Sequence, residues 1–226
     1  MILFNARFSV RVAMVLAIIV ASTSVRAQSA DAVYDRAAKA YGAQRTIDAQ
    51  FDQSITNPLL GKTMTSHGRF QQQRPNLVSI TFTDPAGDRI VGDGKSLWVY
   101  LPSSQPGQVL KLPANSEAGN IANLIGQFLD APKQSFAISG GEVATIEGAS
   151  THKVQLVPHT SSNAPFQRAT LWIDDKDSRV RRVQLLDAQG VDRTITMTTW
   201  ATNSAFDKTV FRFSPPKGVK VVSNIP

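Results

Sequence analysis

Apolar and polar side chains alternate with a period of two residues over most of the chain after residue 46, which is typical of β-strands with one buried face. Between these stretches lie turn-forming blocks such as 84–87 (DPAG) and 93–94 (DG). Closely spaced strands joined by short turns form an antiparallel meander. The pattern predicts strands over 47–51, 78–82, 97–101, 109–112, 136–146, 153–157, 166–173, 180–186 and 191–200.

Two stretches follow helical spacing instead. Over 29–45 the small and apolar residues recur three and four residues apart, and Ser29 is suited to cap the start. Over 116–130 a second apolar stripe predicts an amphipathic helix. We therefore expect an α+β fold that is mostly antiparallel β, with one helix before the sheet and one inserted in its middle. The second stripe consists of Ile121, Leu124, Ile125, Phe128 and Leu129.

The segment 97–101 is apolar on both faces of its predicted strand. Trp98 and Tyr100 point to one face, and Leu97, Val99 and Leu101 point to the other. A sheet that is apolar on both faces is either covered on both or lines a cavity. A curved sheet with an apolar cavity under helical lids suits lipid binding. The alternative is a well-packed core without a cavity.

The first 27 residues differ in character from the rest. Arginines and no acids are found here, ten apolar residues follow one another over 12–21, and small residues precede position 28. Ten apolar residues are too few to cross a bilayer as a helix, which takes about 20. The pattern predicts a signal peptide over 1–27, cleaved after Ala27, rather than an uncleaved anchor. Residues 28–226 are then expected to be one exported, soluble domain.

Charge and composition restrict the partners. The formal charge of the whole chain is +7, and it falls to +4 without the three arginines of the predicted signal peptide. The remaining basic residues are scattered, so we expect no nucleic-acid partner. The chain has no cysteine, which excludes disulfide bonds, thiolate metal sites, cysteine nucleophiles and a lipid anchor on cysteine.

The residues that carry chemistry do not form a catalytic or metal-binding motif. His67, His152 and His159 have neither metal-ligand spacing nor an evident acidic partner in the sequence. No G-x-S-x-G motif occurs, and the block 94–96 (GKS) lacks the first glycine of a phosphate-binding loop. The acidic cluster over 174–177 lacks the glycine and glutamate of a calcium loop and fits a turn between strands. We expect no metal, no cofactor and no enzymatic activity.

A series of short blocks extends over nearly the whole of residues 28–226, and their order and spacing identify a family where no single block does. The blocks are 48–53 (DAQFDQ), 68–70 (GRF), 74–77 (RPNL), 91–100 (VGDGKSLWVY), 171–174 (LWID), 187–190 (DAQG) and 211–219 (FRFSPPKGV). Together they resemble the periplasmic lipoprotein carrier family LolA.

This resemblance implies an incomplete, half-open β-barrel of about eleven strands, covered by helices that act as a lid. It implies a periplasmic carrier whose cavity receives the acyl chains of lipoproteins. An inner-membrane ABC transporter would supply the cargo, and an outer-membrane acceptor would take it. We expect a monomer, because such a carrier visits two different partners in turn.

The resemblance also assigns a role to one residue. Arg74 matches the family arginine that hydrogen-bonds backbone groups of the lid helix and holds the empty carrier shut; the alternatives are a surface arginine or one that pairs with a carboxylate. The cavity and lid are expected to be lined by Val78, Ile80, Phe82, Trp98, Tyr100, Ile121, Leu124, Ile125, Phe128, Leu171, Ile195 and Met197.

Three other functions remain open at this point. The same fold would suit a carrier of another lipid, such as a glycolipid or an isoprenoid. A related half-barrel would suit a sensor of misplaced lipoproteins, although such sensors usually carry a second domain. An enzyme that acts on lipids would need a catalytic constellation, and the sequence shows none.

Overall fold

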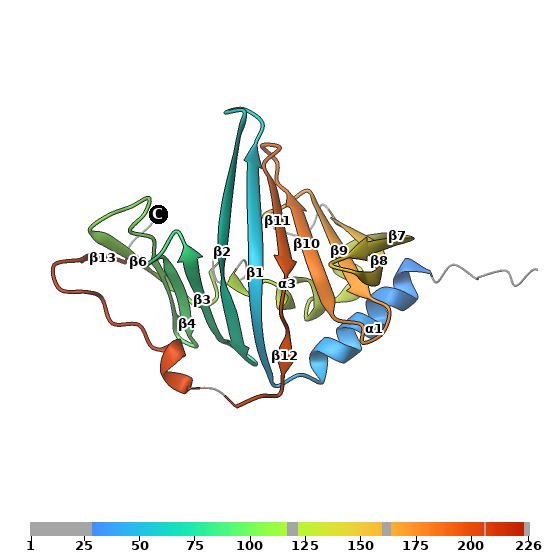
Figure 1. Ribbon diagram of the computed structural model, residues 1–226, viewed down its shortest axis with the longest axis horizontal. Helices are drawn as coiled ribbons and strands as arrows, with labels where there is room; N and C mark the ends of the chain where they lie inside the picture. Colours follow the sequence, from blue (N-terminus) through green and yellow to red (C-terminus); the bar gives the residue numbers. More distant parts are fainter. Residues whose placement is uncertain (1–28, 117–121, 160–163, 206, 224–226) are drawn as a thin grey trace, which may run out of the picture.

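Thirteen strands form one curved sheet in this computed structural model, which describes residues 29–116, 122–159, 164–205 and 207–223 (Figure 1). Neighbouring strands follow the order β13-β6-β5-β4-β3-β2-β1-β11-β10-β9-β8-β7, and β12 pairs with β1. The strands are β1 (Thr46–Asn57), β2 (Lys62–Gln73), β3 (Leu77–Asp84), β4 (Arg89–Asp93), β5 (Ser96–Tyr100), β6 (Gln108–Pro113), β7 (Phe136–Ile146), β8 (Ala149–Pro158), β9 (Arg168–Asp174), β10 (Val180–Leu186), β11 (Asp192–Met197), β12 (Ala201–Thr202) and β13 (Lys220–Val222).

The sheet is not closed into a barrel. Within the part of the chain that the structure describes, β7 forms one edge and β13 the other, and the two do not pair. All neighbouring strands are antiparallel except β13, which runs parallel to β6. The predicted half-open barrel is confirmed. Strands β1 to β11 match the expected number, and β12 and β13 are short additions of two and three residues.

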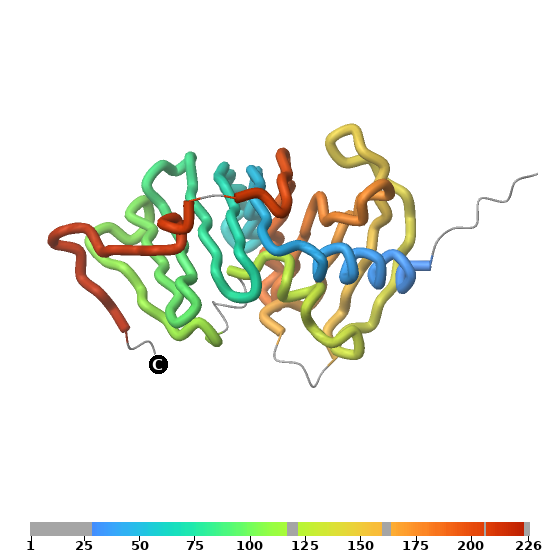
Figure 2. The backbone as a smooth tube through the Cα atoms, turned by 90° about the horizontal axis from the view of Figure 1, so that it is seen from below, coloured from blue at the N-terminus to red at the C-terminus, as the bar shows by residue number. Residues whose placement is uncertain are grey.

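Helix α1 (Ala30–Gly42) confirms the first predicted helix. The Ser29 side chain caps it by accepting a hydrogen bond from the Ala32 backbone at 3.3 Å. Its buried face, which includes Val33, Tyr34 and Ala37, lies against β7, β8 and β9 (Figure 2). We call this face of the sheet the inner face. Among the described residues, no helix has the length and apolar character needed to cross a membrane.

The segment between β6 and β7 joins strands that lie toward opposite ends of the sheet, and its described residues from 122 onward pack on the inner face. It contains α3 (Gly126–Leu129) and η1 (Lys133–Ser135). The predicted continuous helix over 116–130 is therefore wrong in its described part. The Asn123 side chain accepts a hydrogen bond from the Gly126 backbone at 3.2 Å and forms a turn there. Residues 117–121, which include Ile121, lie outside the described residues.

The chain after β12 returns along the outer face of the sheet. The short helix η2 (Lys208–Phe211) contacts β3 and β4, and β13 then pairs with β6 at the edge. Between them, the Phe213 ring lies 5.6 Å from the Trp98 ring and 5.8 Å from the Tyr100 ring, measured between centroids. The C-terminal segment thereby covers the outer face of β5.

The β1–β2 hairpin projects beyond the other strands (Figure 1). At its tip Leu59 and Leu60 are 80% and 67% exposed. The sequence pattern does not predict β2, because the side chains on its inner face include Ser66 and Gly68 and few apolar residues. Pairing with β1 along the full length of both strands places it in the sheet.

The turn between β9 and β10 is held by its acidic residues, as predicted for the cluster over 174–177. The buried Asp174 carboxylate accepts hydrogen bonds from the Arg181 side chain and from the Lys176 backbone. Burial alone would raise the pKa of Asp174, but the bonds from Arg181 and the backbone outweigh it and leave the pKa below its ordinary value.

We expect Asp174→Asn to lower the free energy of unfolding by about 1.5 kcal/mol at pH 7, because the charge-assisted bonds are lost. A lowered folded-state pKa stabilises above the unfolded value, near 3.9, and the gain disappears as the pH falls through the folded value. The difference between wild type and Asp174→Asn should therefore vanish in acid. Urea unfolding from pH 7 to pH 2 measures it, with Glu142→Gln at an exposed position of β7 as the control. A difference that keeps the same size from pH 7 down to pH 2 would contradict this account.

Candidate functional site

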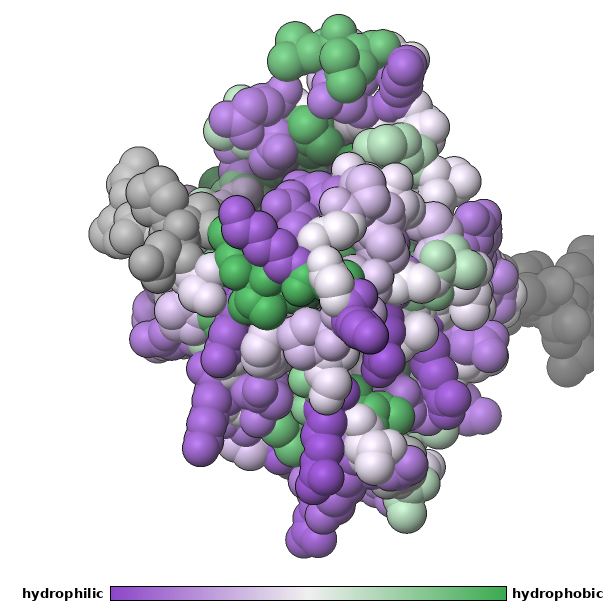
Figure 3. All heavy atoms as spheres, turned by 90° about the vertical axis from the view of Figure 1, so that its left-hand side faces the viewer, coloured by the Kyte–Doolittle hydropathy of each residue, from purple (hydrophilic) through white to green (hydrophobic). Residues whose placement is uncertain are grey.

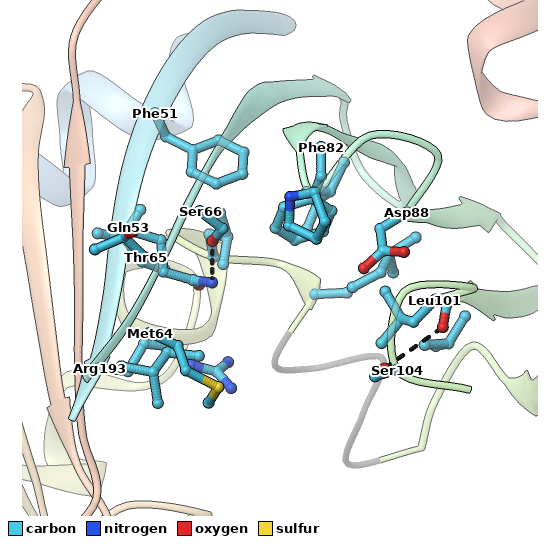
Figure 4. Close-up of a pocket in the computed structure, with 18 of the residues that line it drawn as sticks. Phe51, Gln53, Met64, Thr65, Ser66, Phe82, Asp88, Leu101, Ser104 and Arg193 are labelled. Carbon is cyan, nitrogen blue, oxygen red and sulfur yellow. Dashed lines mark hydrogen bonds between the residues drawn. The ribbon is translucent and has the colours of Figure 1, made fainter. Parts of the chain in front are cut away.

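An apolar cavity of about 590 Å³ lies on the inner face, in the half of the sheet formed by β1 to β5 and β11 (Figure 4). One wall carries Phe51 and Gln53 of β1 with Thr65 and Ser66 of β2, and Phe82 stands across from them. This volume falls within the range of small-molecule binding sites. The space-filling view shows apolar side chains gathered in a recess between polar margins, below the apolar top of the molecule (Figure 3).

The cavity wall is apolar because inward-facing residues of neighbouring strands are in register. Ile80 pairs with Ile90, and Ile90 pairs with Val99, so that one row of aliphatic side chains crosses β3, β4 and β5. All three line the cavity. A continuous row of this kind favours hydrocarbon over water.

Gly68 shapes the side of the cavity that lies away from the aliphatic row. Gly68 of β2 pairs with Phe51 on β1 and with Phe82 on β3. A side chain here would collide with the Phe51 ring and the Thr81 carbonyl, at 2.7 and 2.6 Å from an added Cβ. Without one, the two phenylalanine rings meet edge to face at 5.7 Å across β2.

Some of the predicted lining residues border this cavity and others do not. Ile80, Phe82, Leu124 and Ile195 line it. Val78 lines a separate hollow of about 180 Å³. Four more lie in the filled core beneath α1 and α3, where the Phe128 and Phe166 rings are 5.5 Å apart. These are Ile125, Phe128, Leu171 and Met197.

Trp98 and Tyr100 are a correction to the prediction. They lie on the outer face against Phe213, and it is Leu97 and Val99 that line the cavity. Because both faces of this strand are apolar, the alternation does not say which face turns inward. The C-terminal segment that decides it is far away in the sequence.

Arg74 joins the described part of the segment between β6 and β7 (residues 122–135), which we call the lid segment, to α1, but not through the predicted partners. Its guanidinium donates to both carboxylate oxygens of Asp130, at 2.8 and 3.0 Å, rather than to backbone groups. It also lies 4.4 Å from the centre of the Tyr41 ring. Burial lowers the pKa of Arg74, but the bonds with Asp130 outweigh this effect and leave the pKa above its ordinary value. The residue is thus a permanent cation between β2, α1 and the end of α3.

A polar network next to Arg74 links the same three elements. The Tyr41 hydroxyl donates to Gln72 Oε1 at 2.9 Å, and Gln72 Nε2 donates to Asn123 Oδ1 at 2.7 Å. Burial raises the pKa of Tyr41 to about 12, so the hydroxyl stays a neutral donor. We call Arg74, Asp130, Tyr41, Gln72 and Asn123 the lid latch.

Two histidines do have acidic partners, contrary to the prediction. His67 Nδ1 lies 2.6 Å from Asp52, and His152 pairs with Asp175. Ser150 also donates to Asp175, at 2.5 Å, so the serine and the histidine both bind the carboxylate. A catalytic relay needs the histidine between the serine and the acid, which this order does not provide. Among the described residues, no group of three or more histidine, aspartate or glutamate side chains is placed to hold a metal ion.

Sequence reasoning missed several residues of the cavity wall. Phe51, Ile55 and Ile90 could have been found, since each is apolar on an alternating strand. Arg193 also lines the cavity, and a charged residue gives no signal of facing inward.

Comparisons with known proteins agree with this architecture. A family model described as outer membrane lipoprotein carrier protein LolA matches residues 43–214. An outer-membrane lipoprotein carrier protein of Neisseria meningitidis is 30% identical over 180 residues, which cover 79% of this chain and 81% of that protein. One from Xanthomonas oryzae is 29% identical over 178 residues, covering 79% and 82%. The structure of an uncharacterized conserved protein from Thermus thermophilus is similar in fold, with a TM-score of 0.54 at 16% identity, covering 87% of this chain and all of the other.

Proposed function

The chain belongs to the outer membrane lipoprotein carrier protein LolA family, and from this premise we propose that its apolar cavity carries the acyl chains of lipoproteins through the periplasm. The observation that carries the proposal is the cavity itself. It is walled by aliphatic and aromatic side chains, bordered by Ala122 and Leu124 of the lid segment, and large enough for hydrocarbon. The role is binding and release rather than catalysis.

The energetics of such a carrier require a lid that competes with cargo. Burying an acyl chain of about 16 carbons gains roughly 0.8 kcal/mol per methylene group, or about 12 kcal/mol per chain. A carrier that kept all of this energy would not release its cargo. Opening the lid subtracts from it, because the lid latch breaks and apolar residues such as Leu124 lose their packing.

Loading against a closed lid is uphill, which fits supply by an ATP-driven transporter in the inner membrane. Unloading requires only an acceptor at the outer membrane that offers the chains a more favourable site. Residues 1–27, proposed as a signal peptide cleaved after Ala27, lie outside the described residues, and they would direct export. The carrier would act as a monomer, since one copy meets transporter and acceptor in turn.

A release assay tests the proposal. Inner-membrane vesicles that hold the transporter and a radiolabelled lipoprotein are incubated with the purified protein, with and without ATP. We expect the lipoprotein to leave the vesicles only when ATP and the protein are both present, and to elute with the protein at close to equal molar amounts. Mass spectrometry of material copurified from cells provides the second readout. Glycolipids or isoprenoids in place of acylated peptides would overturn the assignment of cargo.

A further inference from the structure

A charged side chain interrupts the apolar inner row of β11. Arg193, Ile195 and Met197 alternate along this strand, and the last two are buried. Arg193 pairs across the sheet with Ile55 on β1 and Leu185 on β10, so neither cross-strand neighbour supplies a negative charge. The side chain lines the cavity, and its nitrogen atoms point into the open space beside Met64 (Figure 4).

Among the described residues, the guanidinium of Arg193 has no hydrogen-bond or ion-pair partner, although the charge of Asp187 acts on it from nearby. Asp187 is the nearby acid, but its carboxylate accepts hydrogen bonds from the Gln189 and Val191 backbones, both at 2.9 Å. The acid in the opposite wall, Asp88, is likewise bonded to Ser103, at 2.6 and 3.1 Å.

Leaving such a partly buried cation without a partner of opposite charge costs free energy. Burial lowers the pKa of Arg193, yet a guanidinium remains charged near neutral pH. A desolvated charge gains most from a partner of opposite sign that can accept hydrogen bonds. Arg193 also borders a second hollow of about 140 Å³ with Gln127 and Asp187, so it marks one end of the large cavity.

We propose that Arg193 is a headgroup subsite that binds the anionic oxygen atoms, carboxylate or phosphate, of a single-chain amphiphile whose hydrocarbon chain fills the cavity. The guanidinium fork matches either group with two hydrogen bonds. The chain would extend from Arg193 toward the aliphatic row of Ile80, Ile90 and Val99. This inference rests on the proposed function and adds acidic lipids to the ligands that the cavity accepts.

Competition binding at pH 8 tests the subsite. N-phenyl-1-naphthylamine, a neutral fluorescent reporter, is displaced from the purified protein by hexadecanoate, hexadecyl phosphate or methyl hexadecanoate. We expect both anions to bind about tenfold more tightly than the ester to wild type. In Arg193→Met this preference should fall to less than twofold, with the affinity for the ester unchanged. Inorganic phosphate alone should not displace the reporter, which separates an amphiphile from a free ion.

Matched variants keep the test decisive. Arg168→Met removes the same charge from the exposed surface of β9 and should leave the preference intact. Arg193→Lys keeps a charge and should retain part of the preference, which covers the case in which Arg193→Met does not fold. Equal affinity of the acids and the ester in wild type, or an unchanged preference in Arg193→Met, overturns the subsite while the reporter still shows a working cavity. If neither the reporter nor the ester binds, the apolar cavity of the proposed function fails as well.

Discussion

A double variant, Ile90→Trp with Val99→Trp, is expected to weaken the binding of a 16-carbon acyl chain more than a hundredfold. Both residues are half-buried, pair with each other across β4 and β5, and face the cavity. Two indole rings in this position occupy space that the hydrocarbon would use. Excluding as few as four methylene groups removes about 3 kcal/mol of binding free energy, which is roughly a hundredfold in Kd.

Exposed positions on the same sheet supply the control for this double variant. Val143 and Val157 are 66% and 40% exposed on β7 and β8, away from the cavity. Val143→Trp with Val157→Trp adds the same ring surface and should leave the Kd for methyl hexadecanoate unchanged. Thermal unfolding shows that both proteins are folded. If the chain binds the filled variant as tightly as wild type, then it lies elsewhere and the cavity is not the cargo site.

The strands could largely be predicted from the sequence, because inward apolar residues recur every second position on most of them. The exceptions are β2, β4 and the short strands β12 and β13. On β2, Ser66 and Gly68 lie between Met64 and Phe70 on the inner face, and the phenylalanine rings of β1 and β3 meet across Gly68. The amino acids of one strand do not show whether side chains of the neighbouring strands pack over it. Phe51 of β1 and Phe82 of β3 therefore make the inner face of β2 more apolar than the sequence of β2 indicates.

The errors in the candidate site have similar causes. The inward face of 97–101 depends on Phe213, which covers Trp98 and Tyr100 from the distant C-terminal segment. The helix expected over 116–130 is interrupted because Asn123 bonds both the Gly126 backbone and Gln72 of β2. In each place a long-range contact outweighs a local periodicity.

Arg74→Leu is expected to slow the transfer of cargo to the outer-membrane acceptor about thirtyfold while leaving loading intact. In the closed carrier Arg74 makes two hydrogen bonds with Asp130 and stacks on Tyr41. A partly exposed pair of this geometry contributes about 1 kcal/mol, and the cation–π contact adds about as much. Removing both destabilises the empty, closed state by about 2 kcal/mol, so the loaded state becomes relatively more stable. Lipoprotein transfer from the isolated complex to acceptor-containing vesicles measures the rate.

Arg69→Leu is the matched control for the latch variant. Arg69 also makes a double hydrogen bond with a carboxylate, that of Asp48, at 2.8 and 2.5 Å, but this pair joins β1 to β2 and touches neither α1 nor the lid segment. A general loss of surface ion pairs would affect both variants alike, whereas a latch affects only Arg74. Asp130→Asn should reproduce a smaller part of the defect, since the contact with Tyr41 remains. Equal transfer rates in Arg74→Leu, Arg69→Leu and wild type would remove Arg74 from the mechanism and leave the lid to be held by Tyr41, Gln72 and Asn123 alone.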